Sequence, residues 1–369
     1  TETRMPHMKL QAIRLTLIVI GLVTPVSFAQ KYTVGFETRS FTDDTRHNYA
    51  NTGPRPLETV IWYPAAAGSV ASVQPEPESF TKGMFVIEPN APKAPLPAGS
   101  QKFPLIVLSH GTSSLAYSMG WLGWFLASHG YIVAGVNHHG NTVAEPQMLP
   151  QGFVLEWDRP RDLSVLIDKM LADPKFGPRI DSRRIGAAGH SAGGATVIET
   201  AGGTFDATTY CANHAEDKNC NLPAIFRQWI ADYNKIKDTD PVIQEALRHQ
   251  HESHRDPRVK AIFAMAPAIG FAFSEQSLRS IHVPVFIITG AGDTIVDPKT
   301  NAERFAKLIP EVQLKIFPGD ANHYIFSTLC NPSGEKVLGS CKPDAGVSRA
   351  QIHTETEDLA LAFFQKNLK

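Results

Sequence analysis

One serine in the sequence has neighbours of the kind that nucleophilic catalysis requires. Gly189, Ser191 and Gly193 have the spacing G-x-S-x-G, directly after a predicted strand and directly before a predicted helix. Such a sharp turn strains the serine backbone and projects its hydroxyl over the sheet edge, and side chains two residues away on either side would collide. We therefore predict that Ser191 is a nucleophile; a plain glycine-rich helix start is the alternative.

A serine hydroxyl is a weak nucleophile at neutral pH, so it needs a histidine to accept its proton and a carboxylate to orient that histidine. After a turn of this type, the acid and then the histidine follow the serine along the chain. His323 is the only histidine after the last predicted strand that is placed to reach back over the nucleophile. We predict that His323 is the general base; a purely structural histidine is the alternative.

Two aspartates compete for the role of the acid. Asp293 and Asp297 both follow the predicted strand 285–289. Asp297 precedes Pro298, an arrangement typical of a helix N-cap with proline at the first helical position. Asp293 has no such local explanation and lies in the loop that leaves the strand, where the acid is needed, so we predict Asp293. Asp320 is a reserve that fits a turn better.

Hydrolysis through a serine also needs two backbone N–H groups to hold the oxyanion. One should come from Ala192, the residue after the nucleophile, and the other from the loop after the predicted strand 105–109. We predict the N–H of Thr112 as the second donor. His110, in the same loop, is interpreted as a residue that shapes the loop.

The elements that must position these residues alternate along the chain. Apolar, β-branched runs bounded by turn residues are separated by longer helical patterns, which indicates an α/β fold with a mostly parallel central sheet and helices on both faces. The segment 64–102 is rich in Pro, Ala, Gly and Ser and is interpreted as a long surface connection. Residues 202–258 are predicted to be a cap-like insertion after the nucleophile helix, with an amphipathic stretch at 224–236. The predicted strands are 32–37, 59–63, 105–109, 131–136, 184–188, 260–265, 285–289 and 313–317, and the predicted helices include 118–128, 160–171, 300–308 and 355–367.

Composition excludes several classes of protein. The chain has 369 residues, 43% of them hydrophobic and 19% charged, which is typical of a globular protein. Its 35 Lys and Arg residues against 36 Asp and Glu residues give a formal charge of -1. A cationic surface built for nucleic acid is therefore not expected.

The amino terminus has the pattern of an export signal. Lys9 and Arg14 precede an apolar stretch, and Ser27 and Ala29 are small residues at the positions that a signal peptidase reads. We predict that residues 1–29 comprise an upstream extension and a signal peptide, that residues 30–369 form one hydrolase domain, and that the protein is exported to the periplasm or beyond the cell. Its apolar run is short for a membrane span, so no stable span is expected after processing; a retained anchor is the alternative.

Four cysteines form two local pairs, Cys211 with Cys220 and Cys330 with Cys341. Because such pairs oxidise and persist outside the cytoplasm, we predict two short-range disulfides. Four free thiols are the alternative.

Five segments of the chain together resemble one superfamily. The chain resembles an α/β-hydrolase, in particular exported bacterial proteins similar to dienelactone hydrolase and to platelet-activating-factor acetylhydrolase. The resemblance implies hydrolysis of carboxylic esters without a metal or an organic cofactor. Dienelactone hydrolases have a cysteine nucleophile where this chain has Ser191, so a dienelactone substrate is not implied. The matching segments are 60–64, 108–111, 189–194, 290–298 and 322–323.

Several other residues carry weaker signals. His139 follows a predicted strand and is a candidate for the substrate site, with a structural loop histidine as the alternative. Phe271 and Phe273 could contact an acyl group or belong to the core. His249, His251 and His254 lack the spacing and the fourth ligand of a metal site, so a solvated polar stretch is preferred and no metal is predicted.

The sequence thus predicts a serine esterase that forms an acyl-enzyme and acts on a small-molecule, lipid or polymeric ester. A serine peptidase or amidase, and a non-catalytic binding protein of the same fold, remain alternatives. Acyl-chain length, a lid role for residues 202–258 and the oligomeric state stay open.

Overall fold

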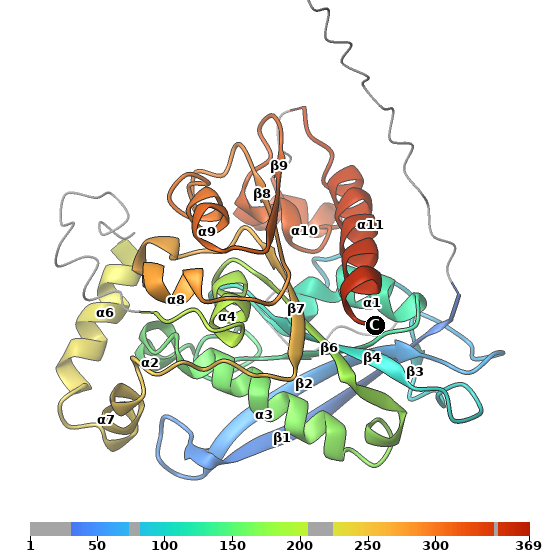
Figure 1. Ribbon diagram of the computed structural model, residues 1–369, viewed down its shortest axis with the longest axis horizontal. Helices are drawn as coiled ribbons and strands as arrows, with labels where there is room; N and C mark the ends of the chain where they lie inside the picture. Colours follow the sequence, from blue (N-terminus) through green and yellow to red (C-terminus); the bar gives the residue numbers. More distant parts are fainter. Residues whose placement is uncertain (1–30, 74–81, 206–223, 343–345) are drawn as a thin grey trace, which may run out of the picture.

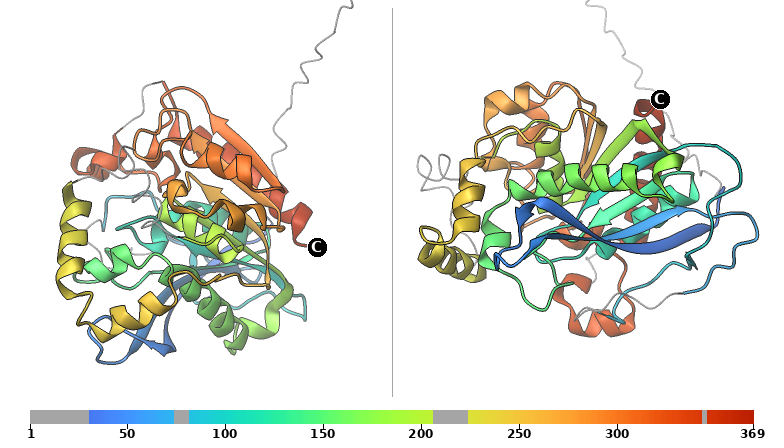
Figure 2. Two further views of the ribbon diagram at one scale, coloured as in Figure 1. Left: turned by 60° about the vertical axis from the view of Figure 1, so that its left-hand side comes forward. Right: turned by 90° about the horizontal axis from the view of Figure 1, so that it is seen from below.

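The computed structural model describes residues 31–73, 82–205, 224–342 and 346–369, and they build one mixed sheet between two layers of helices (Figures 1 and 2). The sheet has the order β3-β1-β2-β5-β4-β6-β7-β8-β9. β2 is antiparallel to β1 and β5, and the strands from β5 to β9 are parallel. The mostly parallel sheet predicted from the sequence is therefore confirmed. The strands are β1 (Val34–His47), β2 (Pro54–Pro64), β3 (Ala91–Pro92), β4 (Phe103–Ser109), β5 (Ile132–Val136), β6 (Ile180–His190), β7 (Val259–Met265), β8 (Val285–Gly290) and β9 (Val312–Phe317).

Helices cover both faces of the sheet, as the alternating pattern predicted. Residues of β4 alternate between two cores because successive strand side chains point to opposite faces. Leu105 and Val107 belong to the core under α3, α4 and α9, whereas Ile106 and Leu108 belong to the core under α1 and α11. The helices are α1 (Gly120–Ser128), α2 (Pro150–Val154), α3 (Asp158–Ala172), α4 (Ala192–Thr200), α6 (Ala224–Ile236), α7 (Pro241–Arg248), α8 (Glu275–Arg279), α9 (Ala302–Leu308), α10 (Pro332–Val337) and α11 (Arg349–Asn367).

The segment after α4 contributes two helices that lie beside α2 at one edge of the molecule (Figure 1). The amphipathic stretch at 224–236 forms α6 as predicted, and its Trp229 ring lies 5.0 Å from the ring of Phe153 in α2. α7 was not predicted; Asp240 caps it by accepting hydrogen bonds from the N–H groups of Val242 and Ile243. The indole N–H of Trp157 donates to a carbonyl of α7, so this helix is tied to the body of the fold.

The connection 64–102 is more ordered than its composition indicates. β3 lies within it and pairs with β1, and Ala91 and Ala94 are buried. Composition signalled a surface loop because proline and small residues disfavour long strands, but a two-residue edge pairing tolerates both.

One of the two predicted disulfides is confirmed. Cys330 and Cys341 are bonded, with a Cα–Cα distance of 5.7 Å. Cys211 and Cys220 lie outside the described residues, as do residues 1–29 of the predicted signal. In the part of the chain that the structure describes, no helix has the length and apolar character needed to cross a membrane.

Candidate active site

Ser191 occupies a strained turn between β6 and α4. Its backbone has φ 58° and ψ -121°, a conformation that costs a non-glycine residue about 1 to 3 kcal/mol. Its N–H donates to the carbonyl of Met265 at 2.9 Å, which helps to hold the turn. A Cβ on Gly189 would lie 2.1 Å from the carbonyl oxygen of Gly193, and a Cβ on Gly193 would lie 1.8 Å from that of Ser109. The two glycines of the motif are therefore sterically required, as predicted.

Three side chains from separate loops meet in one hydrogen-bonded row. Nε2 of His323 lies 2.8 Å from Oγ of Ser191, and Nδ1 of His323 lies 2.7 Å from Oδ2 of Asp293. The other carboxylate oxygen of Asp293 accepts hydrogen bonds from the N–H groups of Ile295 and Val296. Because the carboxylate can only accept, Nδ1 of His323 carries the proton, and Nε2 is free to accept the proton of Ser191.

Close backbone contacts bring the acid and histidine loops together. The N–H of Gly292 donates to the carbonyl of Ala321 at 3.0 Å. A Cβ on Gly290 would lie 2.1 Å from the same carbonyl oxygen, and one on Gly292 would lie 2.7 Å from the backbone of Asp320. These two glycines are a signal for the site that our sequence analysis did not use.

The competing acids have other partners. Oδ1 of Asp297 accepts a hydrogen bond from the N–H of Lys299. α9 begins only at Ala302, with Asn301 as its N-cap, so the interpretation of Asp297 as a helix cap was wrong: it closes a turn before the helix. Asp320 is exposed and follows Gly319, whose φ is 72°, in a turn.

Both predicted oxyanion donors belong to backbone segments that adjoin the nucleophile. Ala192 is the first residue of α4, so its N–H has no intrahelical acceptor. A Cβ on Gly111 would lie 3.2 Å from Cβ of Ser191, which places the loop before Thr112 against the nucleophile. Within the described residues the N–H of Thr112 has no acceptor, while the next N–H, that of Ser113, donates to Oδ1 of Asn141.

A second Ser-His-Asp row lies beneath the first and was not foreseen. Nε2 of His138 lies 2.8 Å from Oγ of Ser109, and its Nδ1 lies 2.9 Å from Oδ2 of Asp162. All three side chains are 0% exposed, whereas Ser191 is partly exposed. Burial lowers the pKa of His138 to about 3, and the neighbouring Arg159 adds to the effect. A substrate carbonyl cannot reach Ser109, so only the row of Ser191 can act on a ligand from solvent.

The buried row is connected to the loop before Thr112. The guanidinium of Arg159 donates to the carbonyl of His110, and the N–H of His138 donates to Nε2 of the same histidine at 3.0 Å. His110 in turn donates from Nδ1 to the carbonyl of Gly111 at 2.7 Å. The network therefore holds the backbone of this loop in place.

Asp162 is expected to be the most important charge of this network for stability. It accepts hydrogen bonds from Arg55 at 2.8 and 2.9 Å and from Arg46 at 2.5 Å. Burial alone would raise the pKa of the Asp162 carboxyl, but the two arginines outweigh burial and hold that pKa well below its usual range. The Asp162→Asn substitution should lower the free energy of unfolding by about 3 to 5 kcal/mol, because it leaves the buried Arg55 without its ion-pair partner, whereas Arg46 keeps Asp43 and Asp158.

Urea unfolding of Asp162→Asn and of Asp168→Asn tests this expectation. The Asp168 side chain is 63% exposed and pairs with Arg258 at the surface, so its substitution should cost less than about 1 kcal/mol. Equal losses in the two variants would contradict a special role for the buried carboxylate.

His190 was not a predicted site residue, but its side chain hydrogen-bonds the backbone of His323. Its Nε2–H donates to the carbonyl of His323 at 3.0 Å, and the two rings lie 4.8 Å apart. Burial lowers the pKa of His190 to about 3, and repulsion from His323 adds to this. His190 is therefore neutral when the site is folded.

Acidification should destabilise the fold through His190. An unfolded histidine has a pKa of about 6.5, so below that pH the unfolded chain binds more protons than the folded chain. The free energy of unfolding should therefore fall between pH 7 and pH 5, and the slope should be smaller in His190→Gln by up to about 1.4 kcal/mol per pH unit. Chemical unfolding at several pH values measures this slope, and His47→Gln, at an exposed histidine, is the control. An unchanged slope in His190→Gln would refute the view that folding lowers the pKa of His190.

The predicted substrate contacts have structural partners. His139 accepts a hydrogen bond from the N–H of Tyr49, donates to Glu145 at 2.8 Å, and stacks on the Tyr49 ring. Phe273 is 3% exposed and packs against Phe205 and Phe305.

Phe271 is 8% exposed and belongs to the same core. These contacts favour the packing alternative for both phenylalanines.

His249 lies between Glu245 and Glu252. Of the residues that the structure describes, no group of three or more His, Cys, Asp or Glu side chains could hold a metal ion.

Comparisons with known proteins point to one kind of relative. Residues 83–153 match the family model of platelet-activating factor acetylhydrolase, isoform II. The chain is 30% identical to cutinase est1 of Thermobifida alba over 107 residues, which are 28% of this chain and 32% of that protein. It is 31% identical to bis(hydroxyethyl) terephthalate hydrolase of Streptomyces coelicolor over 99 residues, 27% of this chain and 28% of that protein.

The platelet-activating factor acetylhydrolase of Bos taurus is 27% identical over 142 residues, with 27% of this chain and 32% of that protein covered. The chain thus matches about a third of the length of these curated relatives. Among solved structures, a ferulic acid esterase from Streptomyces cinnamoneus superposes with a TM-score of 0.63 at 21% identity, covering 93% of this chain and 92% of that one. This likeness extends over the whole arrangement of sheet and helices.

Proposed function

We propose that this chain, which has the α/β-hydrolase fold, hydrolyses carboxylic esters through Ser191. The observation that carries the proposal is the row of Ser191, His323 and Asp293, with hydrogen bonds of 2.8 and 2.7 Å and a partly exposed nucleophile on a strained turn. The relatives that match part of the chain are named a cutinase, a bis(hydroxyethyl) terephthalate hydrolase and a platelet-activating factor acetylhydrolase, which supports an ester rather than another acyl substrate.

The geometry fits an acyl-enzyme mechanism. Oγ of Ser191 attacks the ester carbonyl carbon while its proton passes to Nε2 of His323. The N–H groups of Ala192 and Thr112 hold the negative oxygen of the tetrahedral intermediate. His323 then gives the proton to the leaving alkoxide oxygen, and the C–O bond to the alcohol breaks.

Water completes the cycle. His323 takes a proton from water, the resulting hydroxide attacks the acyl carbon, and the ester bond to Ser191 breaks as its oxygen regains the proton. Asp293 remains a carboxylate throughout and stabilises the imidazolium of His323.

Apolar side chains beside the row favour an apolar group on the substrate. Ile295 is 56% exposed and follows Asp293 by two residues, and Tyr324 is 37% exposed and follows His323 directly. Large apolar side chains exposed beside the acid and the histidine of the site can bind an acyl chain or an aryl ring. The structure and the relatives thus support a small or polymeric ester with an apolar part.

An ester and an amide with the same acetyl group and a nitroaryl leaving group separate the leading function from its alternatives. We expect p-nitrophenyl acetate to be hydrolysed far faster than p-nitroacetanilide, and a fluorophosphonate probe to label Ser191. Faster hydrolysis of the anilide would favour an amidase. Absence of both turnover and labelling in folded protein would favour a binding protein of the same fold.

The protein is also proposed to work outside the cytoplasm. The disulfide between Cys330 and Cys341 supports this location, since such bonds persist in oxidising compartments.

A further inference from the structure

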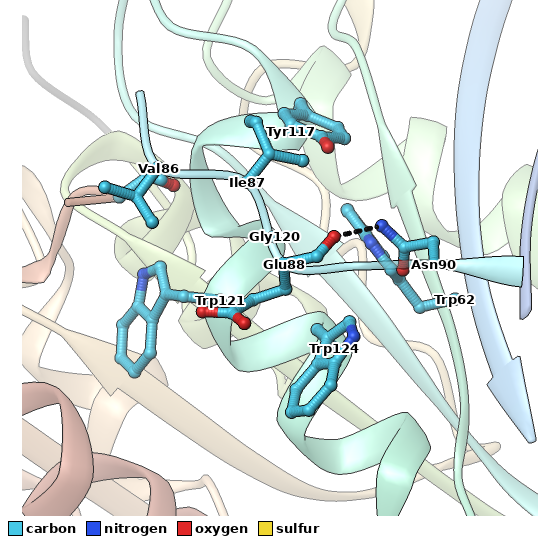
Figure 3. A pocket seen from close by; sticks show the side chains of 10 residues that line it. Trp62, Val86, Ile87, Glu88, Asn90, Tyr117, Gly120, Trp121 and Trp124 are labelled. Atoms are coloured by element: carbon cyan, nitrogen blue, oxygen red, sulfur yellow. Dashed lines mark hydrogen bonds between the residues drawn. The ribbon is translucent and has the colours of Figure 1, made fainter. Parts of the chain in front are cut away.

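A small cavity lies between the segment 86–90 and the first turns of α1, away from Ser191 (Figure 3). Its volume is about 20 Å³, which is room for one group the size of a water molecule. Aromatic side chains form much of its wall, and Glu88 and Asn90 supply polar atoms. The lining residues that matter here are Trp62, Glu88, Asn90, Tyr117, Trp121 and Trp124.

Asn90 leaves an acceptor unused at this cavity. The residue is 1% exposed, and its amide nitrogen donates to the carbonyl of Glu88 at 2.8 Å, as Figure 3 shows. Since that carbonyl can only accept, the amide orientation is determined, and the other amide atom must be the oxygen. This buried oxygen has no hydrogen-bond partner. An unpaired buried acceptor is costly, so the site favours a ligand that donates a hydrogen bond.

Two of the three indole donors in the wall of the cavity have partners elsewhere. The indole N–H of Trp121 donates to the carbonyl of Phe326 at 3.1 Å, and that of Trp124 donates to the carbonyl of Pro89 at 3.0 Å. Both bonds also fix the two rings in the wall of the cavity.

The negative charge at this cavity comes from Glu88, since the raised pKa of Glu357 leaves that neighbour protonated at pH 7. Among the described residues the carboxylate of Glu88 has no ion pair or hydrogen bond, and Figure 3 shows its side chain extending beside Trp121. Burial raises the pKa of Glu357 in α11 to about 8, and the nearby Glu88 adds to this rise. Aromatic ring faces also attract cations. The cavity therefore combines an unpaired acceptor, an unpaired carboxylate and aromatic rings.

We propose that this cavity binds the protonated amino group of a primary alkylammonium ion. The NH₃⁺ group has about the volume of a water molecule, and one of its N–H bonds can donate to Asn90 Oδ1 while the Glu88 carboxylate supplies the counter-charge. The alkyl part would extend through the opening beside Trp124. A quaternary ammonium ion has no N–H to donate and is larger than the cavity, so it should bind poorly.

Calorimetric titration of n-butylammonium chloride tests the proposal on the full chain carrying Ser191→Ala, which separates binding from any hydrolysis. Saturable binding at one site is expected, with little binding of tetramethylammonium chloride or sodium chloride at equal ionic strength. Because the cation loses its counter-charge, Glu88→Gln should weaken binding about tenfold. The matched control is Glu311→Gln, which removes an exposed carboxylate near β9 and should bind as tightly as the parent protein.

Thermal unfolding of each variant verifies that it is folded. Absence of saturable butylammonium binding in folded parent protein would mean that the cavity holds only a water molecule, and the proposal would fail. Equal binding of tetramethylammonium, or unchanged affinity in Glu88→Gln, would also overturn it.

Discussion

Replacing Ser191 with alanine is expected to lower kcat for p-nitrophenyl acetate by at least about 10⁴-fold, because among the described residues no other hydroxyl is hydrogen-bonded to His323. The oxyanion donors and the substrate contacts would remain, so weak residual hydrolysis above the rate in water is compatible with the proposal. Steady-state kinetics with the purified variant measure the loss, and circular dichroism verifies that the fold is retained.

Ser109→Ala is the matched control for Ser191→Ala, since it removes the serine of the second, buried row. Ser109 is fully buried and hydrogen-bonded to His138, so the control should cost stability rather than chemistry. Its kcat should stay within about tenfold of the parent protein, as the loss of one neutral hydrogen bond is modest. If Ser109→Ala lost as much activity as Ser191→Ala, our choice of row would be wrong.

The second large effect is expected from Asp293→Asn, which should lower kcat by about 10³- to 10⁴-fold. An asparagine amide can turn its N–H₂ toward Nδ1 of His323. The histidine would then carry its proton on Nε2 and could not accept the proton of Ser191. Loss of kcat with little change in KM is the expected signature, because the substrate contacts are untouched.

Asp297→Asn separates the triad acid from its neighbour. Asp297 bonds the N–H of Lys299 in the next turn, which an asparagine side chain can also do, so kcat should change by no more than a few-fold. A larger loss of kcat in Asp297→Asn than in Asp293→Asn would reverse the assignment.

Local signals in the sequence were strongest where a backbone conformation depends on a few neighbouring residues. The G-x-S-x-G spacing predicted the turn at Ser191 because glycines at 189 and 193 are needed by contacts within that turn and with β4. The strands were recognisable because both faces of a parallel sheet are covered, so nearly all of their residues are apolar. Asp293 could be preferred over Asp297 from position alone.

Tertiary structure decided which polar side chains, distant in the sequence, form one buried hydrogen-bonded network. Ser109, His138 and Asp162 come from three elements and meet only because β4 and β5 are neighbours and α3 packs across them. His190 gains its role from a carbonyl 133 positions away in the chain.

By itself, therefore, the sequence determined the nucleophile turn, the alternation of strands and helices, and the candidates for base and acid. Only the tertiary structure decided that a second Ser-His-Asp row is sealed from solvent, and that Asn90 and Glu88 face an aromatic cavity. Residue types carry local conformational preference, whereas burial and hydrogen-bond partners depend on how strands are ordered in the sheet.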